Sequence, residues 1–117
     1  MGRTHGQDAV PTTFGKEIAV FTLRLAKIYK TLKNLKLTGK FNGAIGGWNA
    51  HVFIEPHINW EKFSKNFVES LGLEYEYLTT QINHFDDVVK VLNNIHLFNS
   101  ILLGLNQDLW RYISDGW

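Results

Sequence analysis

The sequence contains no cysteine, and its 117 residues include only two prolines. Without cysteine the chain can form no disulfide, no zinc site with thiolate ligands and no cysteine nucleophile. This composition fits a reducing compartment. The formal net charge is only +1, which gives no reason to expect nucleic acid as a partner. The sequence begins without a signal-like apolar region, and no run approaches the roughly 20 apolar residues of a membrane-spanning helix, so we expect a cytoplasmic protein that makes no contact with a membrane.

The 44% of hydrophobic residues are arranged with helical spacing. Residues 13–35 and 85–112 each carry apolar side chains at alternating intervals of three and four, and residues 59–72 form a shorter stretch of the same kind. Residues 73–78 alternate like a strand but have no apparent partner, so they are interpreted as an extended connection. The sequence therefore predicts an all-α fold of long antiparallel helices, whose apolar faces need further helices to cover them.

Two polar patterns have simple explanations that do not require a ligand. The first is a series of lysines near the end of the first helix: Lys27, Lys30, Lys33 and Lys36. We interpret it as a solvated face rather than a phosphate-binding stripe. His51, Glu55 and His57 include side chains that zinc prefers, but Pro56 interrupts the helix that would align them. We therefore predict no metal site, and two histidines that are either exposed or internally hydrogen-bonded.

Two other stretches are candidates for ligand contact. His5 lies between a threonine and a glycine, where an exposed imidazole could meet a ligand, although one histidine in a polar loop is more often an ordinary surface residue. Residues 38–50 contain four glycines, whose backbone can adopt positive φ and approach a ligand closely. The spacing matches neither the P-loop nor the dinucleotide fingerprint, so a simple turn is the alternative.

Seven motifs in order extend the argument beyond local pattern. They are Arg-Thr-His-Gly-Gln (3–7), Pro-Thr-Thr-Phe-Gly-Lys-Glu (11–17), Gly-Lys-Phe-Asn-Gly-Ala-Ile-Gly (39–46), Asn-Ala-His (49–51), Phe-Val-Glu-Ser-Leu-Gly-Leu-Glu-Tyr (67–75), Thr-Thr-Gln-Ile (79–82) and Asp-Leu-Trp-Arg-Tyr-Ile-Ser (108–114). Together they resemble the adenylosuccinate lyases of the fumarase and aspartase superfamily. The resemblance covers nearly the whole chain.

The resemblance implies an elimination that needs no cofactor and no metal. Members of the family release fumarate from adenylosuccinate, giving AMP, and from the succinylaminoimidazole-carboxamide ribotide of purine biosynthesis. A base removes a proton next to a carboxylate, and an acid protonates the departing nitrogen. The resemblance assigns the acid to His5 and substrate contacts to Thr4, Gln81 and Asn42. An imidazole suits an acid that must titrate near neutrality.

The resemblance also implies a setting larger than this sequence. Residues 1–117 correspond to part of the central helical-bundle domain of a homotetramer. Intact members add an amino-terminal domain and a serine loop that carries the base, and neither lies within these residues. We therefore expect the isolated chain to be inactive. The alternative is a non-catalytic helical module that retains only the oligomerisation surface.

The sequence departs from the family pattern at several positions. The family usually has proline at the position of Asp8, asparagine at that of Gly47 and glutamate at that of Asn83. If Thr80 begins the last helix, loss of that glutamate removes its capping-box partner and weakens the helix start by about 1 kcal/mol. His84 is not equivalent to the family histidine one position later.

Overall fold

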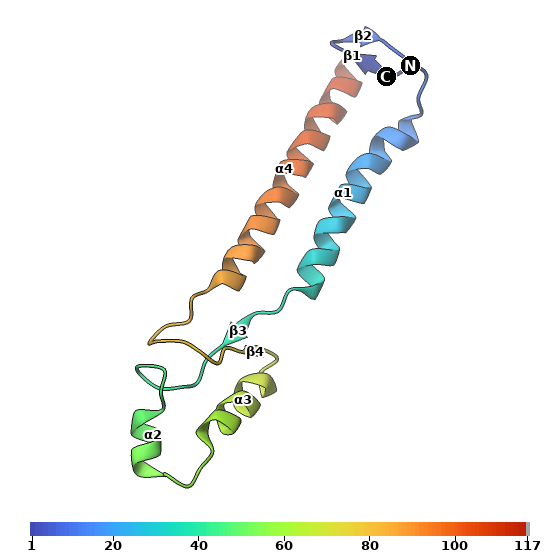
Figure 1. Ribbon diagram of the computed structural model, residues 1–117. Coiled ribbons are helices and arrows are strands. Elements are labelled where there is room, and N and C mark those ends of the chain that lie inside the picture. Colours follow the sequence, from blue (N-terminus) through green and yellow to red (C-terminus); the bar gives the residue numbers. More distant parts are fainter. Residues whose placement is uncertain (117) are drawn as a thin grey trace. The chain divides into compact units, whose positions relative to one another are not determined.

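The computed structural model describes residues 1–116 and divides into two compact units. One unit contains Met1–Asn34 and the chain from Leu92 onward, and the other contains Leu35–Val91. The helices are α1 (Phe14–Asn34), α2 (Asn49–Ile54), α3 (Trp60–Ser70) and α4 (Asp86–Ser114), and the strands are β1 (Arg3–Thr4), β2 (Gln7–Asp8), β3 (Thr38–Gly39) and β4 (Glu74–Tyr75) (Figure 1). Helices dominate the described residues and each strand is two residues long, which agrees with the predicted helical class.

The first unit is built on α1 and the carboxyl-terminal part of α4. The rings of Phe14 and Tyr112 meet edge to face with their centroids 5.8 Å apart. Farther along, Gly104 faces Phe21, since a Cβ at Gly104 would lie 3.6 Å from the ring of Phe21. These contacts bring the start of α1 beside the end of α4, so the two helices pair in opposite directions. A bundle of more helices remains a prediction.

Helix α4 carries a broad apolar surface that the chain leaves exposed. By length and composition it could cross a membrane, and only 6% of its most apolar window is buried. The expectation that no segment approaches this composition was therefore wrong. The same helix contains Asn93, Asn94, His96 and Asn99, side chains that are costly in hydrocarbon. A helix that packs among several others has the same overall apolar character, so composition alone does not assign α4 to a membrane.

The second unit contains a short sheet that the sequence reading missed. Strand β3 pairs in parallel with β4, with Thr38 opposite Glu74 and Gly39 opposite Tyr75. Residues 73–78, predicted as an unpaired connection, therefore include a strand. Its partner is far away in sequence, so no local pattern revealed the pairing. At Gly39 an added Cβ would lie 3.1 Å from the buried Val68 of α3, and glycine allows this close approach.

Aromatic side chains form a cluster in the second unit, in which the rings of Phe63 and Phe67 remain nearly half exposed. Phe41 contacts His51, Phe63 and Phe67, and His51 also meets Trp60 edge to face, with ring centroids 4.9 Å apart. His51 is neither exposed nor hydrogen-bonded through Nδ1, which is buried and has no partner among residues 1–116. The prediction of exposed or satisfied histidines was therefore wrong for His51. His57 is exposed.

The start of α4 differs from the capping expectation. The helix begins at Asp86, and Thr80 lies six residues before it, so Thr80 does not cap it. Asn83 instead turns toward β3, where its Nδ2 donates to the Thr38 carbonyl at 3.0 Å and its Oδ1 accepts from the Thr38 hydroxyl at 3.4 Å. Asp87, which is buried, accepts from the backbone N–H groups of Thr38 and Val88. The predicted penalty for losing a glutamate at this position does not apply.

Asp87 makes the stability of the second unit depend on pH in the acidic range. Its pKa lies below the ordinary aspartate value, chiefly because the carboxylate accepts the Thr38 backbone hydrogen bond. The stabilisation is complete above the ordinary pKa and disappears as the pH falls through the lower folded value. We expect Asp87→Asn to remove this part of the pH dependence in urea unfolding between about pH 6 and pH 2. Asp86→Asn, which removes a neighbouring exposed carboxylate, is the control. If the free energy of unfolding changed with pH equally in the two variants, the pH dependence could not be assigned to Asp87.

Candidate active site

His5 lies at the tip of a hairpin, where a simple polar loop was expected. Strands β1 and β2 pair in antiparallel register, with Arg3 opposite Asp8 and Thr4 opposite Gln7. His5 and Gly6 remain as the two-residue turn, with φ values of 54° and 76°. Two consecutive positive φ values are the requirement of a type I′ hairpin turn, in which glycine is favoured at the second position. The turn presents His5 to solvent on a defined backbone.

The base of this hairpin is fixed by contacts outside its two strands. Gly2 donates to the Val10 carbonyl and Ala9 donates to the Gly2 carbonyl, both at 2.8 Å. Arg3 Nε lies 3.4 Å from the carboxylate of Asp8, one of the positions that depart from the family pattern. Because both side chains are exposed, this ion pair adds little stability. It does give the Asp8 carboxylate a partner within the hairpin.

Thr4 and His5 are joined through their side chains. Thr4 Oγ1 lies 2.9 Å from His5 Nδ1, and the direction of this hydrogen bond depends on the protonation of the ring. An imidazolium donates through both nitrogens, so Nδ1–H can point to the Thr4 hydroxyl while Nε2–H is available to a ligand. The Thr4 hydroxyl is therefore in a position to orient the ring of His5. Its predicted contact with a substrate stays a prediction.

A cavity of about 400 Å³ lies beside His5 in the first unit. The hairpin, the start of α1 and the end of α4 line it, and its charged residues are Arg3, Lys16, Glu17, Asp108, Arg111 and Asp115. Positive and negative side chains are equal in number, so the lining has no excess of one sign. Tyr112 also lines it, and burial together with Asp108 and Glu17 raises the pKa of its phenol. The cavity therefore offers a neutral hydroxyl and charges of both signs next to the histidine.

Asn42 and Gln81, the other two predicted contacts, lie in the second unit. Asn42 has no exposed surface, and its Nδ2 donates to the Thr79 hydroxyl at 2.7 Å. Its Oδ1 is buried and has no partner among residues 1–116. Gln81 is exposed, while its backbone carbonyl accepts from Lys40 Nζ at 2.7 Å. The four candidate residues thus occur as two pairs, Thr4 with His5 and Asn42 near Gln81, one pair in each unit.

Lys40 and Gly46 were missed as individual contributors to this region. The glycine-rich stretch was singled out, but nothing in it indicated that Lys40 reaches residues forty positions away. Gly46 adopts a φ of +82°, and a Cβ there would lie 1.9 Å from the Thr79 carbonyl oxygen. The only signal in the sequence was the recurrence of glycine itself. It predicts close backbone approach without naming what is approached.

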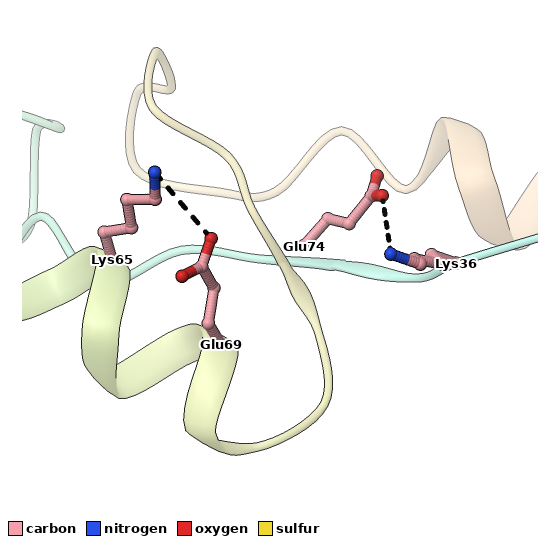
Figure 2. Close-up of polar contacts among 4 residues, drawn as sticks. All are labelled: Lys36, Lys65, Glu69 and Glu74. Atoms are coloured by element: carbon pink, nitrogen blue, oxygen red, sulfur yellow. Dashed lines mark ion pairs between the residues drawn. The ribbon is translucent and has the colours of Figure 1, made fainter.

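A second hollow of about 680 Å³ lies in the second unit beside α3 and β4. Figure 2 shows the ion pairs that line it: Lys36 Nζ is 3.5 Å from the Glu74 carboxylate and Lys65 Nζ is 4.0 Å from that of Glu69. Lys36 lies beyond the end of α1. The prediction that it belongs to a helical lysine face was therefore wrong. Because both lysines have carboxylate partners, this hollow is not a prepared site for an anion.

Comparison with known proteins identifies the family to which this arrangement belongs. The model of a family described as Lyase matches residues 1–116. The adenylosuccinate lyase of Buchnera aphidicola (subspecies Acyrthosiphon pisum) is 46% identical over 111 residues, or 95% of this chain and 24% of that protein. For the enzyme of Haemophilus influenzae the values are 44%, 97% and 25%, and for that of Legionella pneumophila (strain Corby) 45%, 100% and 26%.

The chain spans about a quarter of the length of the curated relatives it matches. The match nevertheless runs through all the motifs from the His5 hairpin to the end of α4, because it leaves almost no residue of this chain outside it. Neither pair of candidate residues therefore lies outside the region of similarity. The resemblance seen in the sequence is confirmed, and the chain belongs to the lyase family, with adenylosuccinate lyases among its relatives.

Proposed function

We propose that this chain is the part of an adenylosuccinate lyase that supplies the general acid of the reaction. The observation that carries the proposal is the geometry of His5. The ring is exposed at the tip of a hairpin, its Nδ1 lies within hydrogen-bond distance of the Thr4 hydroxyl, and a cavity lies beside it. A general acid needs a fixed orientation and one free nitrogen, and this arrangement supplies both.

The proposed reaction is the β-elimination of fumarate from adenylosuccinate, giving AMP, and from the succinylaminoimidazole-carboxamide ribotide. A base takes the proton from the carbon next to a succinyl carboxylate, and the electron pair becomes the new double bond. The carbon–nitrogen bond breaks, and the nitrogen takes the proton from His5 Nε2. The base belongs to a segment outside these residues. Thr4 and Gln81 are the proposed substrate contacts. Asn42, the third residue that the resemblance assigns, is fully buried and donates to the Thr79 hydroxyl, so it is not proposed to touch the substrate itself.

The proposed setting of the chain is the central helical bundle of a homotetramer. The exposed apolar surface of α4 supports this proposal, since exposed large side chains such as Leu92, Leu97, Leu103 and Ile113 need a cover in water. In an oligomer of this chain, long helices of other copies would supply that cover. A cytoplasmic location belongs to the same proposal.

Reconstitution tests the proposed function. The chain would be mixed or co-expressed with the remaining segments of the Legionella relative, whose matched region would be left out. We expect fumarate release from adenylosuccinate when both parts are present and none from either part alone. Assembly without any release of fumarate would contradict the proposal. That result would favour the alternative, a non-catalytic oligomerisation module, which the same exposed apolar surface supports.

A further inference from the structure

The segment around Gln81 is held by the glycine-rich stretch of the same unit. Lys40 Nζ donates to the backbone carbonyls of Thr80 and Gln81, each at 2.7 Å, and to that of Gly43 at 3.3 Å. A lysine ammonium has three N–H donors, and these carbonyls use all three. Lys40 therefore joins two stretches of chain that lie about forty residues apart in the sequence.

The neighbours of Gln81 are fixed as well. On one side, the Thr79 hydroxyl accepts from the buried Asn42 at 2.7 Å. On the other side, Asn83 Nδ2 donates to the Thr38 carbonyl at 3.0 Å. The side chain of Gln81 itself is exposed. The segment is thus held through the side chains of Thr79 and Asn83 and through the backbone carbonyls of Thr80 and Gln81, while the exposed amide side chain of Gln81 can meet a ligand.

We infer that Lys40 is a positioning residue that sets the orientation of Gln81 for substrate. This inference rests on the proposed function, because Lys40 acts on the substrate only through Gln81. The physical reason is preorganisation: an exposed loop loses conformational entropy when it is ordered by a ligand, and a loop already ordered loses less. The ammonium bonds are charge-assisted, which makes them stronger than neutral hydrogen bonds to the same carbonyls.

The first test reads the backbone of the chain directly. We expect Lys40→Met to lower the NMR backbone order parameters of residues 80–82 from the rigid range of about 0.85 toward the flexible range below about 0.6. Lys40→Arg keeps the charge and several donors, so it should preserve most of the order. Lys62→Met, at an exposed lysine of α3 in the same unit, is the matched control. Unchanged order parameters in folded Lys40→Met would overturn the inference.

The second test measures whether this order matters for substrate. In the reconstituted lyase we expect Lys40→Met to raise the KM for adenylosuccinate about tenfold, with a smaller change in kcat and with recovery in Lys40→Arg. The double variant Lys40→Met/Gln81→Ala should be no worse than Gln81→Ala, because Lys40 acts through Gln81. The inference would be overturned if the effects of Lys40→Met and Gln81→Ala on KM were additive in the double variant. It would also be overturned if Lys40→Met lowered the order parameters of residues 80–82 and left the KM unchanged.

The two tests separate failure of the inference from failure of the proposed function. If Gln81→Ala leaves the KM unchanged, the proposed role of Gln81 in substrate binding falls, whatever Lys40 does. If Gln81→Ala raises the KM but Lys40→Met changes neither the order parameters nor the KM, the role of Gln81 stands and that of Lys40 falls. Lys62→Met shows the effect of removing one positive charge from this unit.

Discussion

Replacing His5 with alanine should lower the rate of fumarate release by the reconstituted lyase by a factor of about 10² to 10⁴, the usual contribution of a positioned general acid. The substitution removes the donor of the proton that the departing nitrogen needs. It keeps the hairpin, because alanine leaves the β1–β2 register and the Gly6 turn residue in place, although a positive φ is less favourable for alanine. The measurement is kcat by the appearance of fumarate.

His57→Ala is the matched control for His5→Ala. His57 is also an exposed histidine, but it lies in the second unit and lines neither cavity. Its replacement should leave kcat unchanged. Added imidazole should restore part of the activity of His5→Ala and none of the activity of any variant that fails to assemble. A kcat within twofold of wild type for assembled His5→Ala would remove His5 from the acid role.

A second variant separates the contribution of the His5 imidazole from that of the hairpin turn that holds it. Gly6→Ala should disturb the type I′ turn, because Gly6 has a φ of 76° although nothing lies within 4 Å of an added Cβ. We expect a smaller loss of kcat than for His5→Ala, since the imidazole is still present but less well oriented. A larger loss would indicate that the hairpin matters for assembly rather than for proton transfer.

The helices could be predicted from sequence because their signals are local. The three-and-four spacing placed α1, α3 and α4 within a few residues of their observed ends. Asn59, the residue before α3, caps that helix by accepting from Lys62 N at 2.9 Å. The β3–β4 pair could not be predicted, because each strand is two residues long and the partners lie more than thirty residues apart. Short strands carry too little alternation to reveal a partner.

The candidate residues differ in the same way between what the sequence could predict and what it could not. His5 and Gln81 came from motifs whose order along the chain is visible in the sequence. The geometry that holds them was not visible: Lys40 and Asn83 bond to atoms of residues about forty positions away, mostly through carbonyls, which every residue has. Side-chain type indicates what a residue can donate, and only the fold determines which carbonyl receives the bond. Asn42 illustrates the point, since it was predicted as a substrate contact and is fully buried against Thr79.

Replacing Gly46 with alanine should destabilise the second unit by about 3 to 5 kcal/mol, the range reached when a substitution forces backbone apart. Two effects add. The φ of +82° costs an alanine about 1 kcal/mol, and its Cβ would lie 1.9 Å from the Thr79 carbonyl oxygen, which belongs to backbone and cannot rotate away. The measurement is the free energy of unfolding from urea denaturation, with amide exchange in α3 as a probe of the second unit.

Gly72→Ala isolates the clash from the conformational cost. Gly72 lies in the same unit with nearly the same φ, +80°, and nothing lies within 4 Å of an added Cβ. It should therefore lose only about 1 kcal/mol. The difference between the two variants measures the close approach of residue 46 to Thr79. Because Thr79 also receives the Asn42 bond and adjoins the carbonyls held by Lys40, pushing it away should loosen Gln81 as well. Equal losses for Gly46→Ala and Gly72→Ala would mean that the two backbone stretches do not meet as closely as described.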